Sequence, residues 1–329
     1  MKVLTILIAA AVALLLSGSS EAREPPQLGV VLNGLDNPYF VAMYQGVKDE
    51  AARRNAPVSF RAPQSHADVS RQVAEVRAVV ASKKDCYAIS PIDPAHLVNP
   101  LRGVRQPVVL LDSPLDRATA RKAGLRIATA IGSSDFGAGR LAGGEMVSLL
   151  HGTGQVALLG GFPTGNGVLR LQGFQRAIAG TGVRVVARAN AGYVQVKAEA
   201  AAAEMLRKHP QLAGFFAAND LMALGAADAV SAAGRTGEVA IIGMDGITEA
   251  LDAIRSGEMS ATVSQYPYVM GRMAVEACLA AARGDVLPGR VDAPVAVVTR
   301  ANVARASAMF PRPFRTYSDP FARLLSRQR

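Results

Sequence analysis

Apolar and polar blocks alternate along the chain from residue 28 to about residue 299. Short apolar runs of strand type, such as Leu28–Leu32 and Val108–Leu111, are each followed by a segment of helical character. One such segment covers 67–82, where valines recur every three or four positions. This alternation predicts parallel strands joined by helices, an α/β fold with doubly wound parallel sheets. About ten strands are expected, which is too many for one ordinary open sheet, so the pattern favours two consecutive lobes.

The first 22 residues have the pattern of an export signal rather than of a fold. Lys2 precedes the apolar run Val3–Leu16, and Ser20 and Ala22 place small residues before a cleavage site after Ala22. The run is shorter than the ~20 residues of a comfortable membrane span, so a cleaved secretory signal peptide is predicted at 1–22. An uncleaved membrane anchor is the alternative. The mature chain is expected to be exported.

The net charge of +10 is concentrated at the carboxyl end. Residues 300–329 hold seven arginines and one aspartate, which leaves about +4 for the body of the chain. A nucleic-acid partner is therefore not expected. The Pro- and Arg-rich stretch 302–329 shows no clear period and is interpreted as a basic tail, either laid on the surface or disordered.

Cys86 and Cys278 are the two cysteines of the chain. Export permits one disulfide bond between them but does not require it. Both lie among apolar residues, so the sequence favours free, buried thiols. Neither a metal site nor a catalytic Cys/His pair is supported.

Polar and aromatic residues follow the first predicted strand. Asn33 and Asn37 supply amide groups, and Tyr39 and Phe40 supply flat apolar faces. Loops at the carboxyl ends of parallel strands face the ligand crevice of open α/β sheets. Amides bind hydroxyls and rings cover the C–H faces of a sugar, so this stretch suits a polyhydroxylated ligand. The alternative is a capped helix start with Pro38 at its first position and two core aromatics.

The same placement recurs at later strand ends. Carboxylates, amides, a guanidinium and a phenol stand there: Asp112, Arg170, Tyr193, Asn219, Asp245 and Gln265. Each alone fits a turn former or a helix cap, and Asp220 fits the cap of the following helix. Together they form the donor and acceptor set that reads vicinal hydroxyls. None is an obvious nucleophile, which favours binding over catalysis.

Familiar catalytic and cofactor motifs are missing from the chain. The glycine-rich stretch Gly160–Gly167 is not G-x-G-x-x-G and is interpreted as a flexible loop, and no phosphate loop, G-x-S-x-G or H-E-x-x-H occurs. The four histidines, at positions 66, 96, 151 and 209, have no ligand spacing and are expected on the surface or as caps. No cofactor and no metal is expected.

Four stretches of the chain resemble one protein family. They are LNGLDNPYF at 32–40, RLQGFQRAI at 170–178, FAANDLMALGAADAVSAAG at 216–234 and IIGMDGITEALDAIRSGEMSATVSQ at 241–265. The chain is similar over about 28–299 to the ribose-type periplasmic sugar-binding proteins of ABC transporters, which have the type I periplasmic binding fold. The resemblance implies two lobes, 28–133 plus 266–294 and 134–265 plus 295–301, joined by a three-strand hinge that closes over a sugar.

The resemblance also assigns roles. Tyr39 and Phe40 correspond to a ring-stacking pair, with Tyr193 on the other lobe, and hydroxyl-binding positions correspond to Asn37, Asp112, Arg170, Asn219, Asp245 and Gln265. Asn33 falls where the family often has a small hydroxyl residue, and Ser113 where it often has arginine. A ligand other than ribose is therefore expected, among pentoses, hexoses, polyols and related metabolites.

The implied protein is a monomeric, non-enzymatic binding protein of the periplasm that delivers its ligand to a membrane permease. A chemoreceptor- or sensor-facing binding protein of the same fold is the first alternative. A transcription regulator would need a helix-turn-helix segment where the export signal stands. An α/β dehydrogenase or hydrolase would need the motifs that are missing.

Overall fold

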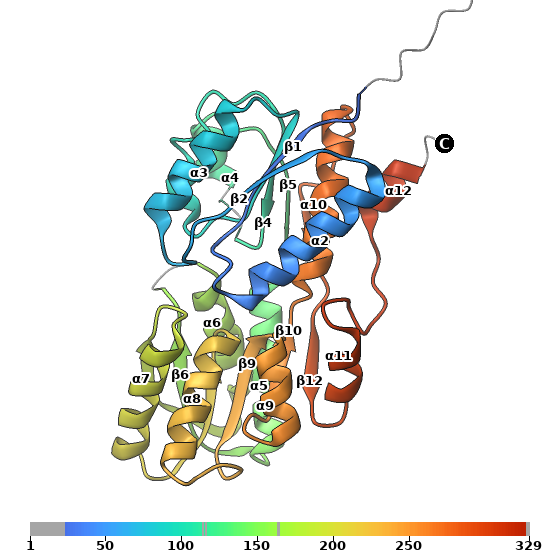
Figure 1. The fold of residues 1–329 in the computed structure, drawn as a ribbon. Coiled ribbons are helices and arrows are strands. Elements are labelled where there is room, and N and C mark those ends of the chain that lie inside the picture. Colours follow the sequence, from blue (N-terminus) through green and yellow to red (C-terminus); the bar gives the residue numbers. More distant parts are fainter. Residues whose placement is uncertain (1–23, 114, 116, 163–164, 327–329) are drawn as a thin grey trace, which may run out of the picture.

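A computed structural model describes residues 24–113, 115, 117–162 and 165–326. The predicted signal peptide at 1–22 lies outside the described residues. Within them, no helix is both long enough and apolar enough to cross a membrane. The described chain forms two lobes, one above the other in Figure 1.

The first lobe contains a six-stranded sheet whose paired strands are all parallel. Its order is β11-β5-β4-β3-β1-β2. The strands are β1 (Leu28–Val31), β2 (Val58–Arg61), β3 (Cys86–Ile89), β4 (Val108–Leu111), β5 (Ile127–Gly132) and β11 (Arg290–Asp292). The short strand β11 was not predicted from the sequence, because three residues carry too little periodicity.

Helices cover both faces of this sheet. On one face lie α2 (Pro38–Arg54) and α10 (Pro267–Ala282), and on the other α3 (Val69–Ala81), η1 (Pro94–Leu97) and α4 (Arg117–Lys122). Successive residues of β1 serve opposite faces, since Val30 packs in the core with α2 and α10 while Val31 packs in the core with α3. Helices α2 and α10 touch closely, because a Cβ on Gly46 or Gly271 would lie 2.0 Å from a backbone oxygen of the other helix.

The second lobe repeats the plan with the order β12-β10-β9-β8-β6-β7. Its strands are β6 (Thr153–Gly160), β7 (Gly182–Asn190), β8 (Leu212–Ala217), β9 (Ala240–Asp245), β10 (Ala261–Ser264) and β12 (Ala296–Thr299). Only the β10–β12 pair is antiparallel among these described strands. One face carries α5 (Asp135–Leu149) and α6 (Asn166–Ile178), and the other carries α7 (Gln195–Lys208), α8 (Asp220–Ala232) and α9 (Thr248–Ser256).

The chain passes between the lobes at three places. These are the segments 133–134 after β5, 265–266 after β10 and 293–295 after β11. Two parallel-sheet α/β lobes joined by three crossings confirm the predicted fold class. Because every crossing follows a strand, it lies at the same sheet edges as the strand-end loops.

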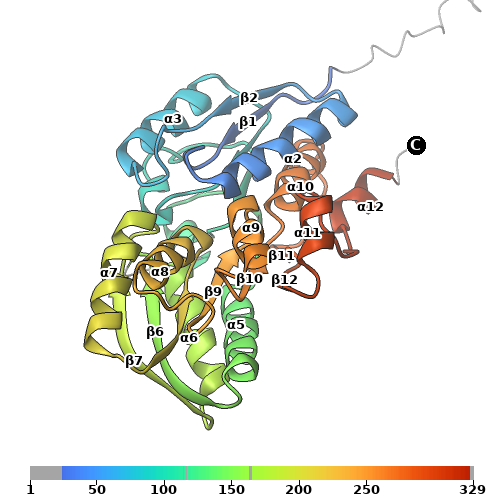
Figure 2. The same ribbon diagram turned by 60° about the horizontal axis from the view of Figure 1, so that its bottom comes forward.

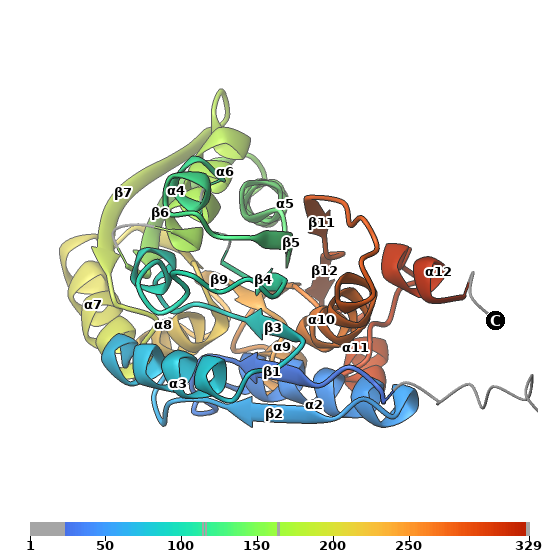
Figure 3. The ribbon, with the colours of Figure 1, turned by 90° about the horizontal axis from the view of Figure 1, so that it is seen from above.

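The carboxyl-terminal segment, expected to be either laid on the surface or disordered, is laid on the body of the molecule within the described residues, but it forms helices that the sequence did not predict. Helix α11 (Val303–Met309) packs beside α9 and β12, and α12 (Pro320–Ser326) packs on α10. Figure 2 shows both helices along one side of the molecule, and Figure 3 shows α12 against the outer side of α10. The side chains of Phe314, Phe321 and Leu325 are buried. The segment has few apolar residues, and Pro and Arg separate them, so the sequence pattern did not predict this packing.

A correction concerns the cysteines. Cys86 and Cys278 are not free thiols but form a disulfide bond, with their Cα atoms 5.5 Å apart. Cys86 begins β3 and Cys278 lies on the face of α10 that covers the sheet. Their apolar surroundings were predicted. The two cysteines are 192 positions apart in the sequence, however, and they meet only because α10 packs on the sheet.

Candidate functional site

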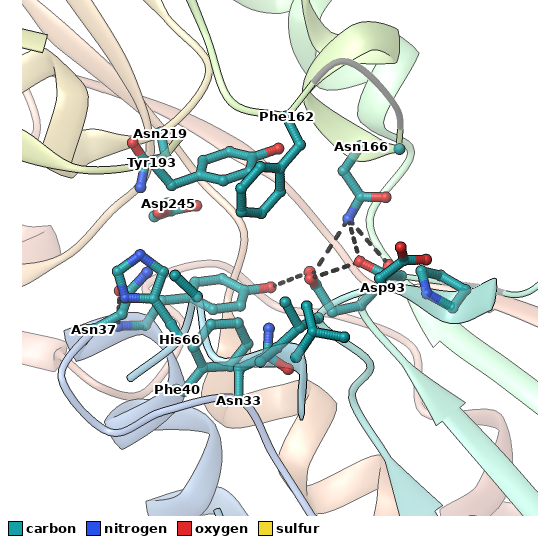
Figure 4. Close-up of a pocket in the computed structure, with 18 of the residues that line it drawn as sticks. Asn33, Asn37, Phe40, His66, Asp93, Phe162, Asn166, Tyr193, Asn219 and Asp245 are labelled. Carbon is teal, nitrogen blue, oxygen red and sulfur yellow. Dashed lines mark hydrogen bonds between the residues drawn. The ribbon is translucent and has the colours of Figure 1, made fainter. Parts of the chain in front are cut away.

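A cavity of about 390 Å³ lies between the two lobes, at the carboxyl ends of their strands. Figure 4 shows side chains from both lobes converging on it. The predicted residues that line it are Asn33, Asn37, Tyr39, Phe40, Asp112, Ser113, Arg170, Tyr193, Asn219 and Asp245. Gln265, also predicted, is not among the residues that line the cavity. Its side chain forms hydrogen bonds with Arg170 and Asp245, which do line it.

The first wall of the cavity is built at the start of α2. Asn37 is the N-cap, and its side-chain oxygen accepts the Tyr39 backbone N–H at 3.0 Å. Tyr39 and Phe40 follow in the first turn, with ring centroids 5.0 Å apart and edge-to-face geometry. Asn37 therefore caps the helix, and the same turn brings the two rings to the cavity.

Asn33 is held by a residue that the sequence did not single out. Gln72 of α3 donates from Nε2 to Asn33 Oδ1 at 3.1 Å and to the Ser90 carbonyl at 2.8 Å. Its Oε1 accepts the backbone N–H of Ile92 at 2.8 Å. One buried amide thus joins the loops after β1 and β3, which fixes the first-lobe side of the cavity.

Asp112 stands directly after β4. Its Oδ1 accepts a hydrogen bond from the Tyr39 hydroxyl at 2.9 Å. Burial and the nearby Asp112 carboxylate raise the pKa of Tyr39 well above its usual value, so the phenol keeps its proton and remains a donor. Three wall residues, Asp112, Tyr193 and Asp245, have positive φ values of 60°, 65° and 139°. Such backbone costs about 1–3 kcal/mol per residue and concentrates at ligand sites.

The second wall is centred on Arg170 of α6. Its guanidinium donates to Asp135 Oδ1 at 2.8 Å, to the Ala218 carbonyl at 2.8 Å and to Gln265 Oε1 at 3.1 Å. Gln265 Nε2 in turn donates to Asp245 Oδ1 at 2.7 Å. These bonds join residues from α5, α6 and the ends of β8, β9 and β10 into one network.

Burial and charge act against each other in this network. Burial lowers the pKa of Arg170, but Asp135 and Asp245 raise it by more, so the guanidinium stays charged. Burial raises the pKa of Asp135 to about 6 although Arg170 lowers it. Burial, with Asp220 adding to it, raises the pKa of Asp245 well above its usual value. The positive charge of Arg170 therefore favours the ionised forms of Asp135 and Asp245, which burial disfavours.

The loop that carries Asp245 is fixed by Asp220. Asp220 Oδ2 accepts the backbone N–H groups of Gly246 at 2.7 Å and Ile247 at 3.0 Å, and Oδ1 accepts from Thr262 Oγ1 at 2.6 Å. The N-cap of α8 is Asn219, whose side chain accepts the Met222 N–H at 3.0 Å. The expected cap at Asp220 was therefore wrong by one residue.

The loop before α6 contributes residues that the sequence did not predict. Phe162 lies edge-to-face with Tyr193 at 5.4 Å, and the Tyr193 hydroxyl accepts the Gly167 N–H at 3.1 Å. Asn166 Nδ2 reaches the first lobe, at 3.1 Å from Ser113 Oγ and 3.4 Å from Asp112 Oδ2. This loop was interpreted only as a flexible connection, and of it residues 163–164 lie outside the described chain. Its aromatic and amide residues, Phe162 and Asn166, were the signal available.

His66 also lines the cavity, which differs from the expected surface or capping role. Its Nδ1 lies 3.0 Å from Asp36 Oδ2, while its buried Nε2 has no partner among the described residues. The loop after β2 brings it there with Ala67, and Val69 at the start of α3 follows. Asp93 comes from the loop after β3, and Pro94 is the first residue of η1. No spacing signal in the sequence marks these positions.

The site offers hydrogen-bonding groups and ring faces in one enclosed space. Among the described residues, no group of three or more His, Cys, Asp or Glu is arranged to hold a metal ion. Carboxylates and amide oxygens accept from hydroxyls, amide N–H groups donate to them, and rings cover C–H faces. The arrangement can therefore bind a small polar solute from two opposite sides.

Comparison with known proteins agrees with this geometry. The model of a family described as periplasmic binding protein domain matches residues 28–285. The D-allose-binding periplasmic protein of Escherichia coli is 30% identical, over 82% of this chain and 89% of that protein. The ribose import binding protein RbsB of Bacillus subtilis is 29% identical, over 83% and 87%. A solute-binding protein of an ABC transporter from Actinobacillus succinogenes, solved with bound D-allose, superposes with a TM-score of 0.80 at 28% identity, over 85% of this chain and 99% of that one.

Proposed function

The chain belongs to the periplasmic binding protein domain family, and from this premise we propose that it captures a sugar or sugar-like polyhydroxylated molecule. It hands this ligand to the permease of an ABC transporter. The relatives named above carry ribose and allose in their names, and the solved neighbour holds D-allose. This chain covers 87–89% of the two relatives' length, so most of each relative has a counterpart here.

One observation carries the proposal. Ten predicted residues from separate strand ends of two lobes line a single cavity. Within it, Asn37 and Phe40 stand on one wall, and Asn219 and Asp245 on the other. Amide and carboxylate groups from both sides would hydrogen-bond hydroxyls, while the aromatic rings would cover the apolar face of the ligand.

Closure of the two lobes supplies selectivity in this proposal. The three crossings at 133–134, 265–266 and 293–295 act as the hinge, and the ligand is buried as the lobes approach. Contacts between Asn166 and Ser113 join the lobes across the cavity mouth. No bond is made or broken in this cycle. The protein works as a monomer in the periplasm, after cleavage of the signal peptide near Ala22.

A ligand screen tests the proposal. Protein purified without denaturation is examined by native mass spectrometry for a co-purified solute, and its melting temperature is measured against a panel of pentoses, hexoses and cyclitols. Any solute that binds only the folded state stabilises it by about 2.7 kcal/mol at a hundredfold excess over the dissociation constant. A flat melting temperature across the panel, with no co-purified solute, would contradict the proposal, and turnover of a panel compound would favour an enzyme.

A further inference from the structure

The cavity is lined by more acidic than basic side chains. Among the described residues, three carboxylates line it, those of Asp93, Asp112 and Asp245, against the guanidinium of Arg170. Asp93 lies at the rim with its side chain 42% exposed, 3.0 Å from the Nδ1 of His96. Asp245 lies 3.8 Å from Arg170 Nη1. These two carboxylates have a basic partner, which leaves Asp112.

The side chains that hydrogen-bond the Asp112 carboxylate are neutral. Its carboxylate accepts from the Tyr39 hydroxyl at 2.9 Å, and Ser113 Oγ and Asn166 Nδ2 approach its second oxygen at 3.4 Å. Within the described part of the chain, no Lys, Arg or His nitrogen forms an ion pair with it. The residue is only 8% exposed. A buried carboxylate without a cation is costly, so a positive charge bound beside Asp112 would stabilise it.

Arg170 does not supply that charge, because its nitrogens are engaged on the second lobe. Nε, Nη1 and Nη2 donate to Asp135, the Ala218 carbonyl and Gln265. Among the described residues, the ion pairs of this guanidinium are with Asp135 and Asp245 and not with Asp112. The surroundings of Asp112 also suit a cation, since the faces of aromatic rings attract positive charge. Four aromatic residues share the cavity with it: Tyr39, Phe40, Phe162 and Tyr193.

His66 adds a further acceptor. The Asp36 carboxylate can only accept, so the His66 Nδ1 carries the proton in their contact at 3.0 Å. In the neutral ring the buried Nε2 then presents a lone pair, and this atom has no partner among the described residues. An acceptor without a donor and a carboxylate without an ion-pair partner thus line the same cavity, which suits a ligand rich in N–H or O–H donors.

We propose that the ligand is a polyhydroxylated molecule with a protonated amino group, an amino sugar or an aminocyclitol, whose ammonium pairs with Asp112. This inference rests on the proposed function and narrows its ligand class. It also excludes sugar acids and sugar phosphates, because an added anion would face Asp112 and Asp245 in a buried space.

Matched series test the inference. D-glucosamine, D-glucose and D-glucuronate form one series, the three corresponding galacto compounds a second, and an aminodeoxy-inositol with myo-inositol a third. Binding is measured by calorimetry and thermal shift at pH 7. We expect the amino member of at least one series to bind at least tenfold more tightly than its neutral parent, and the acidic members to give no shift.

The outcomes separate the two proposals. Neutral sugars or cyclitols that bind as tightly as their amino counterparts, in every series that binds, would overturn this inference and leave sugar capture standing. Failure of every member, together with no co-purified solute, would overturn both. Tight binding of an acidic member would likewise contradict the charge argument.

A charge-removing variant sharpens the test. Asp112→Asn keeps the shape of the side chain and removes its charge, so we expect the tenfold preference for the amine to fall to about one. Asp252→Asn makes the same change on the exposed face of α9 and should keep the preference. Circular dichroism of both ligand-free variants checks folding. Retention of the preference in Asp112→Asn would overturn the assignment to this carboxylate, and the wild-type series stands independently of either variant.

Discussion

Two buried charge clusters in this protein have different balances. The helix cluster joins α2 and α10 and holds three arginines, Arg53, Arg54 and Arg272, against two glutamates, Glu50 and Glu276, with the Asp319 carboxyl beside Glu276. The cavity cluster lines or supports the cavity and holds one arginine against three aspartates: Arg170, Asp112, Asp135 and Asp245. Both contain carboxylates that are almost fully buried.

The difference teaches how a fold separates stability from binding. In the helix cluster Glu50 and Glu276 share Arg53 and Arg54, and Arg272 of α10 reaches Glu50 at 3.1 Å, so each glutamate has an arginine partner within the chain. Burial, with Asp319 and Glu50 adding to it, raises the pKa of Glu276 to about 9. In the cavity cluster Arg170 is used by Asp135 and Asp245, and Asp112 is left over. A ligand is expected to change the second cluster and not the first.

The largest effect is expected from removing the cation of the cavity cluster. Arg170→Met leaves the buried Asp135 without its partner at 2.8 Å, so the free energy of unfolding of the ligand-free protein should fall by about 3–5 kcal/mol. Urea denaturation measures this loss. Arg176→Met, on an exposed position of the same helix, should change stability by less than about 0.5 kcal/mol.

A double variant tells charge from packing at the same site. Adding Asp135→Asn to Arg170→Met removes the orphaned carboxylate and should recover part of the lost stability, because the two residues are in direct contact. Equal stability of the single and double variants would assign the loss to packing alone. A loss below about 1 kcal/mol in Arg170→Met would contradict the claim that this ion pair holds the second wall.

The next effect concerns the disulfide bond that links α10, one of the two helices of the helix cluster, to the first-lobe sheet. The disulfide between Cys86 and Cys278 ties α10 to β3, so replacing both cysteines by alanine should lower the free energy of unfolding by about 3 kcal/mol. Neither residue lines the cavity, and ligand affinity should stay within about threefold of wild type. Thiol titration of denatured wild-type protein should find the bond intact. A large loss of affinity would mean that the two regions are coupled.

The smallest effect is a dependence on pH in the helix cluster. Burial raises the pKa of Glu50, but bonds from Arg53 and Arg54 lower it by more, to about 2. A carboxyl whose folded pKa is depressed adds stability above its unfolded pKa of 4.5 and loses it as pH falls through the folded value. Glu50→Gln should therefore cost about 2 kcal/mol at pH 7, and the difference from wild type should shrink between pH 4.5 and pH 2.

Urea denaturation of both proteins across that pH range measures the difference. Ligand affinity at pH 7 serves as the control, since Glu50 does not line the cavity and its replacement should leave affinity unchanged. A constant difference between variant and wild type from pH 7 to pH 2 would show that the Glu50 contribution is not one of charge.

Local pattern determined much of this protein. Alternating strand and helix periods predicted the α/β class, and turn chemistry after the strands marked residues such as Asn37, Asp112 and Asp245 as candidates. In parallel sheets the carboxyl ends of all strands meet at one edge, so knowing where each strand ends is enough to collect these side chains in one place. The same reasoning did not single out His66, Phe162 or Asn166, although they follow the ends of β2 and β6, because His66 was expected on the surface or as a cap and the loop before α6 was interpreted only as a flexible connection.

Tertiary packing decided the pairings. The apolar surroundings of Cys86 and Cys278 were readable, but their bond depends on the seat of α10 against β3. The charge of Asp112 was likewise readable, while its lack of a cation follows from Arg170 turning toward Asp135. The burial of Phe314 and Phe321 likewise depends on tertiary contacts. A sequence shows whether a residue is polar or apolar; which partner it meets depends on contacts that only the assembled lobes bring within a few ångströms.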